Sequence, residues 1–221
     1  MQILLNAALL AAAYLLGAIP IGLFVVKWLS GEDVRTVESG RTGGTNVFRA
    51  AGVLPGAITI FLDGFKGTLS VWLVLLLAPG SDWIAVIAAL LAIIGHNYSI
   101  FLLERDNHGR LRFRGGAGGA TCAGGSVGLW FPSLFIIAPL ALVILYFVGY
   151  ASVATMSIAL LSMLLFAIRA WMGASPWEYV FYGFFSFFLL AWSLRPNIRR
   201  LIQGNERMVG WRVKKKKNSQ S

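Results

Sequence analysis

Cysteine, histidine and acidic residues are scarce in this chain of 221 residues. The sequence has one cysteine, Cys122, two histidines, and nine Asp and Glu residues. A single cysteine cannot form an internal disulfide, and so few histidines provide no metal-binding set. Charged residues make up only 13% of the chain, whereas an ordinary soluble domain has about 25%. These shortages exclude a soluble domain and a disulfide framework, and we expect no metal site.

Long apolar runs dominate the chain instead, and hydrophobic residues make up 57% of it. Runs of about 20 apolar residues are long enough to cross a bilayer. We therefore predict an all-α integral membrane protein with about seven transmembrane helices, one membrane domain at 1–205 and a basic cytoplasmic tail at 206–221. The first run has no basic segment before it and no clear cleavage site, so we expect a retained helix. The apolar segments lie at 3–27, 52–78, 83–102, 117–131, 133–149, 151–172 and 176–194.

The fourth apolar segment is the weakest candidate for a span. It is short, rich in glycine and other small residues, and stops at Pro132. Such a segment suits close helix packing or a re-entrant half-helix better than a span that faces lipid on its own. Six spans is therefore the alternative to seven.

Positive charge is distributed unevenly along the chain. The net charge is +10, and residues 195–217 hold nine of the nineteen Lys and Arg residues. A basic cluster beside a membrane helix is an orientation signal that also contacts anionic lipid, and we favour this interpretation over nucleic-acid binding. With that tail in the cytoplasm, seven spans place the N-terminus outside and loops 28–51 and 103–116 inside. Those loops carry seven arginines and the outside loops only Arg169, which agrees with the positive-inside rule.

A glycine-rich stretch at 38–49 separates the first two apolar runs. Its glycines allow several backbone N–H groups to point into one concavity, where an anion can bind. Short hydroxyl and amide side chains add hydrogen bonds, and two arginines add fixed positive charge. The stretch therefore predicts a phosphate site at a membrane face, although a flexible polar connector is the simpler interpretation. The predicted contacts come from Ser39, Gly40, Arg41, Gly43, Thr45, Asn46 and Arg49.

A second glycine-rich stretch, at 112–121, leads directly into the fourth apolar segment. Its N–H groups can open the N-terminus of a helix toward an anion. It is not a Walker A motif, because the Gly-Lys-Ser/Thr ending is absent. Phe113 also stands where an aspartate would complete a His-x4-Asp dyad with His108. The predicted contacts here come from Arg114, Gly115, Gly116, Gly118 and Thr121.

Five polar residues lie in or beside apolar segments. Asp63 and Lys66 are three residues apart within the second segment and therefore share a helical face. They form either an ion pair that ties helices together or an anion site in which Asp63 orients Lys66. His96 ends the third segment and is either a general base, a phosphate donor or a structural helix-end residue. Asn197 and Glu206 follow the last segment in a basic amphipathic stretch that would lie on headgroups without needing either residue.

These motifs, taken together and in this order, resemble those of the acyl-phosphate:glycerol-3-phosphate acyltransferase (PlsY) family. The resemblance covers nearly the whole chain, and six stretches match in register within a similar hydropathy pattern. The matching stretches are Gly17-Ala18-Ile19-Pro20, residues 39–49, Asp63-Gly64-Phe65-Lys66-Gly67, Gly95-His96, residues 113–121, and residues 197–206.

The resemblance implies a seven-helix enzyme in a bacterial plasma membrane, with its active site at the cytoplasmic face. The family transfers a fatty acyl group from acyl-phosphate to the 1-hydroxyl of glycerol 3-phosphate, giving lysophosphatidic acid and phosphate, the first step of phospholipid synthesis. The resemblance implies no cofactor. The implied partners are the two substrates, membrane lipids and the enzyme that makes acyl-phosphate. Substrate-assisted deprotonation would explain why no Ser-His-Asp arrangement is present. The residues expected to act in catalysis are Ser39, Arg49, Lys66 and His96.

Several positions depart from the family pattern. Arg41 stands where the family has asparagine, and Gly44 where it has alanine. Ala117 replaces a lysine that contacts phosphate, Leu194 replaces a histidine, and the loop around 103–110 is longer. Because one loop gains a cation where the other loses one, we predict that Arg41 supplies the charge missing at Ala117. A diverged relative that binds an anionic lipid or phosphometabolite without turnover is the alternative. A small anion transporter is a third, supported only by Asp63 and Lys66.

Overall fold

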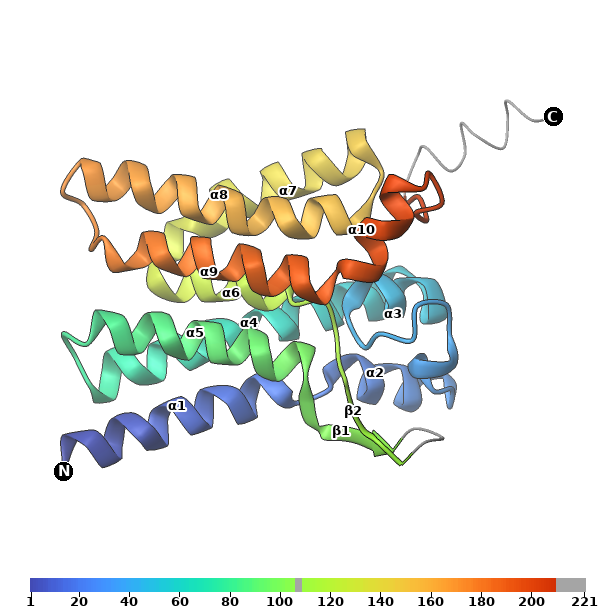
Figure 1. Cartoon of the computed structure of the whole chain (residues 1–221), viewed down its shortest axis with the longest axis horizontal. Coiled ribbons are helices and arrows are strands. Elements are labelled where there is room, and N and C mark those ends of the chain that lie inside the picture. The colour runs from blue at the N-terminus through green and yellow to red at the C-terminus, as the bar shows by residue number, and fades with distance from the viewer. Residues whose placement is uncertain (106–108, 210–221) are drawn as a thin grey trace.

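The computed structural model describes residues 1–105 and 109–209, and most of them are helical (Figure 1). Four helical stretches, 2–30, 53–77, 131–148 and 151–171, are long and apolar enough to cross a membrane. The helices are α1 (Gln2–Ala18), α2 (Ile21–Ser30), α3 (Gly44–Ala51), α4 (Val53–Leu77), α5 (Asp82–Asn97), α6 (Gly119–Leu129), α7 (Leu134–Val148), α8 (Ala151–Trp171), α9 (Glu178–Ser193) and α10 (Arg195–Ile202), with 3₁₀ turns at Val34–Thr36 and Phe131–Ser133.

The long helices run roughly along one axis, and the polar connections gather at one end. α2, α3, α10 and a β-hairpin lie at the right end of Figure 1, opposite the N-terminus. α4 packs on α6, α1 on α5, and α8 on α9. This arrangement brings both glycine-rich stretches and α10 to the same end of the bundle.

α6 lies inside the bundle, against α4, α5, α7, α8 and α9. At 11 residues it is only about 17 Å long, at about 1.5 Å per residue. Its glycines let backbones approach closely, because a Cβ at Gly124 would overlap the carbonyl of Gly64 and one at Gly67 would overlap that of Thr121. These contacts agree with the close packing expected of the fourth apolar segment.

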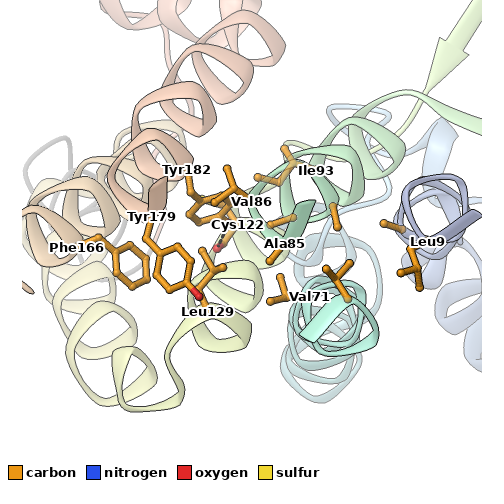
Figure 2. Close-up of a cluster of buried hydrophobic side chains, with 14 of the residues drawn as sticks. Leu9, Val71, Ala85, Val86, Ile93, Cys122, Leu129, Phe166, Tyr179 and Tyr182 are labelled. Atoms are coloured by element: carbon orange, nitrogen blue, oxygen red, sulfur yellow. Dashed lines mark hydrogen bonds between the residues drawn. The ribbon is translucent and has the colours of Figure 1, made fainter. Parts of the chain in front are cut away.

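The main hydrophobic core joins α1, α4, α5, α6, α8 and α9 (Figure 2). Leu9, Val71 and Ile93 occupy one side of it, and Phe166 and Tyr182 the other. The Tyr182 hydroxyl donates a 2.6 Å hydrogen bond to the carbonyl of Cys122, so its polar tip is satisfied inside the core. This core fixes α6 between the two halves of the bundle.

Two predicted boundaries are wrong. The first apolar run is not one continuous helix, because α1 ends at Ala18 and α2 begins after Pro20, which has no N–H to donate. The third segment ends at Asn97 rather than continuing to residue 102. Strand β1 (Ser99–Arg105) begins there and pairs antiparallel with β2 (Leu111–Arg114). The all-α prediction therefore fails in this loop, where apolar and charged residues alternate in β2 with the period of a strand.

Candidate active site

A cavity of about 320 Å³ lies at the end of the bundle where the polar connections gather. It has a polar part beside α3 and α10 and an apolar part between α6, α7 and α8. The polar lining is Ser39, Arg41, Thr45, Asn46, Arg49, Asp63, His96, Ser152, Thr155, Asn197, Arg200, Glu206 and Arg207. The apolar lining includes Ala123, Ile137, Ala138, Ala141, Leu142, Leu145, Ala154 and Ile158. One continuous space thus joins a group of cations to a region suited to hydrocarbon.

The first glycine-rich stretch delivers a helix N-terminus and an arginine to the polar part. α3 begins at Gly44, and Gly43, Gly44 and Thr45 all line the cavity. N–H groups in the first turn of a helix favour an anion in front of them. Arg49 lies about one turn further along. Burial lowers the pKa of the Arg49 guanidinium and the Glu38 carboxylate opposes that shift, but an arginine stays charged at neutral pH.

Asn46 organises this loop from within. It is buried, and its side-chain amide donates to the carbonyls of Val34, Val37 and Arg41 at 3.0, 3.0 and 2.9 Å. Its Oδ1 accepts from the N–H of Ser39 at 3.3 Å. These bonds occupy the amide donors that were predicted to contact phosphate. Asn46 therefore shapes the loop that presents Ser39 and Arg41.

Arg41 connects three parts of the chain. One Nη donates to the Gly116 carbonyl at 3.3 Å and to the Ser193 hydroxyl at 3.2 Å, and the other donates to the Ser193 carbonyl at 2.6 Å. Burial lowers the pKa of Arg41, and the nearby Arg200 lowers it further. Ala117, which follows Gly116, lines the same cavity. The Arg41 guanidinium thus lies beside Ala117, the position at which the resemblance predicts a lysine.

His96, Asp63 and Lys66 form a buried charged group behind the cavity. Asp63 Oδ1 lies 2.8 Å from Lys66 Nζ and 3.4 Å from His96 Nδ1. Lys66 also donates to the carbonyl of Ile19, at the break between α1 and α2, at 2.9 Å. Asp63 and His96 line the cavity, whereas Lys66 does not. The contacts of Lys66 match the interpretation in which it ties helices together, and they leave His96 as the member whose Nε2 faces the glycine loops.

The second glycine-rich stretch contributes mainly backbone. A Cβ at Gly116 would overlap His96 Nε2, and Gly118 adopts φ +86° as the chain enters α6. The N–H of Thr42 donates to the carbonyl of Gly115 at 3.3 Å, so the two loops are joined. Arg114 instead pairs with Glu104 on β1 at 2.8 Å. The predicted residues that lie outside the cavity lining are Gly40, Lys66, Arg114, Gly115, Gly116 and Thr121.

The segment after α9 closes the polar end. Asn197 Nδ2 donates to Glu206 Oε1 at 2.8 Å, and Arg200 Nε lies 3.7 Å from Glu206 Oε2. The chain then pairs with the turn between α7 and α8, where the N–H of Val209 donates to the Gly149 carbonyl at 2.8 Å. Asn197 and Glu206 both belong to the cavity lining. His108 and residues 210–221 of the predicted basic tail lie outside the described residues.

Comparisons with known proteins agree with this architecture. Residues 7–204 match the family model described as glycerol-3-phosphate acyltransferase. The chain belongs to the glycerol-3-phosphate acyltransferase family. A relative in Moorella thermoacetica, glycerol-3-phosphate acyltransferase 2, is 37% identical over 207 residues, covering 92% of this chain and 97% of the relative. A glycerol-3-phosphate acyltransferase of Thermus thermophilus is 37% identical over 204 residues, 92% of this chain and 95% of the relative.

A solved structure of this family has the same fold. It is the crystal structure of PlsY (YgiH), an integral membrane glycerol 3-phosphate acyltransferase, in its glycerol 3-phosphate form. The two chains share 29% identity with a TM-score of 0.79, covering 93% of this chain and 96% of the other. The lysophosphatidic acid form gives a TM-score of 0.76 at 27% identity, covering 93% and 95% of the two chains. The chain is therefore a multi-pass membrane protein of a family with bacterial members.

Four polar residues of the cavity were missed by sequence reasoning: Ser152, Thr155, Arg200 and Arg207. Ser152 and Thr155 lie three residues apart at the start of α8, and two polar side chains at that spacing in an apolar helix are a signal that could have found them. Arg207 follows a predicted site residue and pairs with Glu38. Within residues 1–105 and 109–209, no three His, Cys, Asp or Glu side chains are placed to hold a metal ion.

Proposed function

We propose that this chain transfers a fatty acyl group from acyl-phosphate to the 1-hydroxyl of glycerol 3-phosphate, giving lysophosphatidic acid and inorganic phosphate. The observation that carries the proposal is the single cavity with a cationic end and an apolar end. Both substrates carry phosphate, which the arginines and the α3 N-terminus suit, and only the donor carries a long acyl chain. The names of the relatives and the ligands in the PlsY titles support glycerol 3-phosphate as the acyl acceptor and lysophosphatidic acid as the product.

In the proposed reaction, the glycerol oxygen attacks the acyl carbon and the bond from that carbon to the phosphate oxygen breaks. The hydroxyl proton passes to a phosphate oxygen of a substrate or to His96. Phosphate is already a good leaving group, so positioning and charge stabilisation supply much of the catalysis. Arg41 and Arg49 hold the phosphates, and Ser39 and Thr45 add hydrogen bonds.

His96 has the geometry of a base or a phosphate donor. Asp63 lies 3.4 Å from Nδ1, so a proton on Nδ1 leaves Nε2 free to accept one from the substrate. Lys66 Nζ contacts the same Asp63 oxygen, at 2.8 Å. In this proposal Asp63 and Lys66 are positioning residues, and His96 is the group that meets the substrate.

The membrane arrangement that fits these observations has seven crossings, with the N-terminus outside and the active site at the cytoplasmic face of the bacterial plasma membrane. α1, α4, α5, α6, α7, α8 and α9 supply the crossings, and α6 is short enough to require its neighbours around it. The arginine-rich connections support this orientation because they gather at the end of the bundle that holds the cavity.

The proposal is tested with purified protein in detergent, palmitoyl-phosphate and glycerol 3-phosphate. We expect phosphate release that requires both substrates and falls about 100-fold in Arg49→Ala. Release from palmitoyl-phosphate alone would contradict acyl transfer to glycerol 3-phosphate. Transfer from palmitoyl-CoA in place of palmitoyl-phosphate would identify a different donor.

A second candidate is a family member that binds without turnover. It is favoured by Leu194, a buried apolar residue lining the cavity at a position where the family has histidine, and by Ala117. Glycerol 3-phosphate binding measured by calorimetry, with no phosphate release in the same preparation, would support it over the enzyme.

A further inference from the structure

A second concave region lies on the outer side of α5, α9 and α10. This lipid groove has a volume of about 730 Å³ and shares no lining residue with the active-site cavity. Leu90 and Ile94 of α5, Phe188 and Trp192 of α9, and Ile198 of α10 form its surface. Its volume lies within the range of about 300–1,000 Å³ that holds one small ligand. Its apolar surface suits a hydrocarbon chain.

The groove carries a cation at one rim. The Arg195 guanidinium lies 3.5 Å above the centre of the Trp192 ring, and its Nε donates to the Trp192 carbonyl at 2.9 Å. These contacts use Nε and the face of the guanidinium, so the Nη groups can donate to a phosphate. Arg199 follows one turn later on the exposed surface of α10. The rim is therefore complementary to an anionic headgroup.

We propose that this groove binds an anionic phospholipid of the surrounding membrane, with one acyl chain in the groove and the headgroup phosphate on Arg195. A membrane phospholipid is the occupant because the groove faces away from the bundle and joins an apolar surface to a single cationic rim. Trp and Arg side chains are also the residues that anchor a protein at the headgroup level. An anionic headgroup adds attraction that a zwitterionic one does not provide.

The lipid groove and the active-site cavity share α10 as a wall. Arg195 and Ile198 line the groove, whereas Asn197 and Arg200 line the cavity. Asn197 and Arg200 both face Glu206. A lipid in the groove therefore contacts the helix that carries these two cavity residues.

Lipid retention tests the proposal without relying on activity. The protein is equilibrated with equimolar phosphatidylglycerol and phosphatidylcholine in mixed micelles, purified, and examined by native mass spectrometry. Wild type is expected to retain one phosphatidylglycerol at least fivefold over phosphatidylcholine. Arg195→Gln is expected to lose that preference, and Ala191→Trp, which fills the groove but keeps Arg195, is expected to lower total retention.

A matched arginine provides the control. Arg169 lies 3.7 Å above the Trp130 ring and donates to the Ala174 carbonyl at 2.6 Å, and it lines neither concave region. Arg169→Gln is expected to keep the wild-type preference. Equal retention of both lipids by wild type, or an unchanged preference in Arg195→Gln, would overturn the site. Wild-type retention in Ala191→Trp would also overturn it, because the chain would then lie elsewhere.

Discussion

The two glycine-rich loops have similar compositions and lie against each other, but they present different groups to the cavity. The loop at 38–49 places Ser39, Arg41 and Arg49 in the cavity lining. The loop at 112–121 places Arg114 in an ion pair with Glu104 and gives the cavity only small residues. Composition predicts where an anion site forms, but the partner of each charged side chain decides which charge reaches the ligand.

The β-hairpin explains the difference. Glu104 of β1 pairs with Arg114 at 2.8 Å and with Arg35 at 2.5 Å, and Asp33 also contacts Arg35. Glu104 therefore neutralises the arginine of the second loop and ties that loop to the segment before the first. Arg41 and Arg49 have no carboxylate within ion-pair distance among the described residues. Their charge remains available to a phosphate.

Removing Arg49 is expected to have the largest effect. Arg49→Ala should lower kcat/KM about 100-fold, because a charge-assisted hydrogen bond contributes about 1.5–3 kcal/mol and the phosphate in front of α3 then loses one of its two arginines. The measurement is phosphate release at varied glycerol 3-phosphate. Arg112→Ala, on the hairpin and away from the cavity, is the matched control and should stay within about twofold of wild type by the usual small effect of surface changes.

Moving the positive charge from Arg41 to position 117 tests whether the two loops share a single cation. Arg41→Asn should lower activity about 30-fold by the same reasoning, and Ala117→Lys in that background should recover most of it. Recovery in the double variant, with little effect of Ala117→Lys alone, means that the two positions hold one shared cation. Near-wild-type activity of both Arg41→Ala and Arg41→Asn would contradict the prediction.

The second loop is expected to affect activity because Gly116 leaves room for the His96 imidazole, and not because the loop supplies charge. Gly116→Ala adds a Cβ that overlaps His96 Nε2, so the imidazole must move. A displacement of about 1 Å at a reacting group can cost up to about 100-fold, and we expect about a tenfold loss of activity because a side chain can partly yield. Gly64→Ala, where the added Cβ would lie 3.5 Å from the Ala120 carbonyl, is the control and should be nearly neutral. Equal activity of the two variants would show that His96 needs no space from this loop.

The sequence was sufficient to predict the membrane class and most of the apolar segments, and phosphate binding by the loop at 38–49 stays a prediction. Arg41, Arg49 and His96 line one cavity, as expected of a shared site. Hydropathy and charge can be predicted because they are properties of each segment and do not depend on which residues meet in the folded chain. Asn197 and Glu206 were singled out as polar residues that a headgroup-binding stretch does not need, and the resemblance gave them a place in the site. Asn197 on α10 and Glu206 after it both line the cavity.

Other features depended on pairings that a single sequence does not reveal. Asn46 was predicted to contact phosphate, but the folded loop engages its amide with three backbone carbonyls. Lys66 could be placed on the face of Asp63, but not against the carbonyl of Ile19, because that contact depends on the break between α1 and α2. The hairpin was missed because its strands are short and lie beside a strongly apolar helix.

The smallest effect is expected for Arg114, although it resembles Arg41 in sequence context. Arg114→Gln breaks a half-exposed pair with Glu104, and such pairs contribute about 0–1 kcal/mol, so activity should fall less than about threefold. Glu104→Gln should have a similarly small effect on stability and should leave Arg114 free. If Arg114→Gln instead lost as much activity as Arg49→Ala, the guanidinium would have to leave Glu104 and reach the substrate. The two loops would then both supply charge, and the difference between them would exist only before substrate binds.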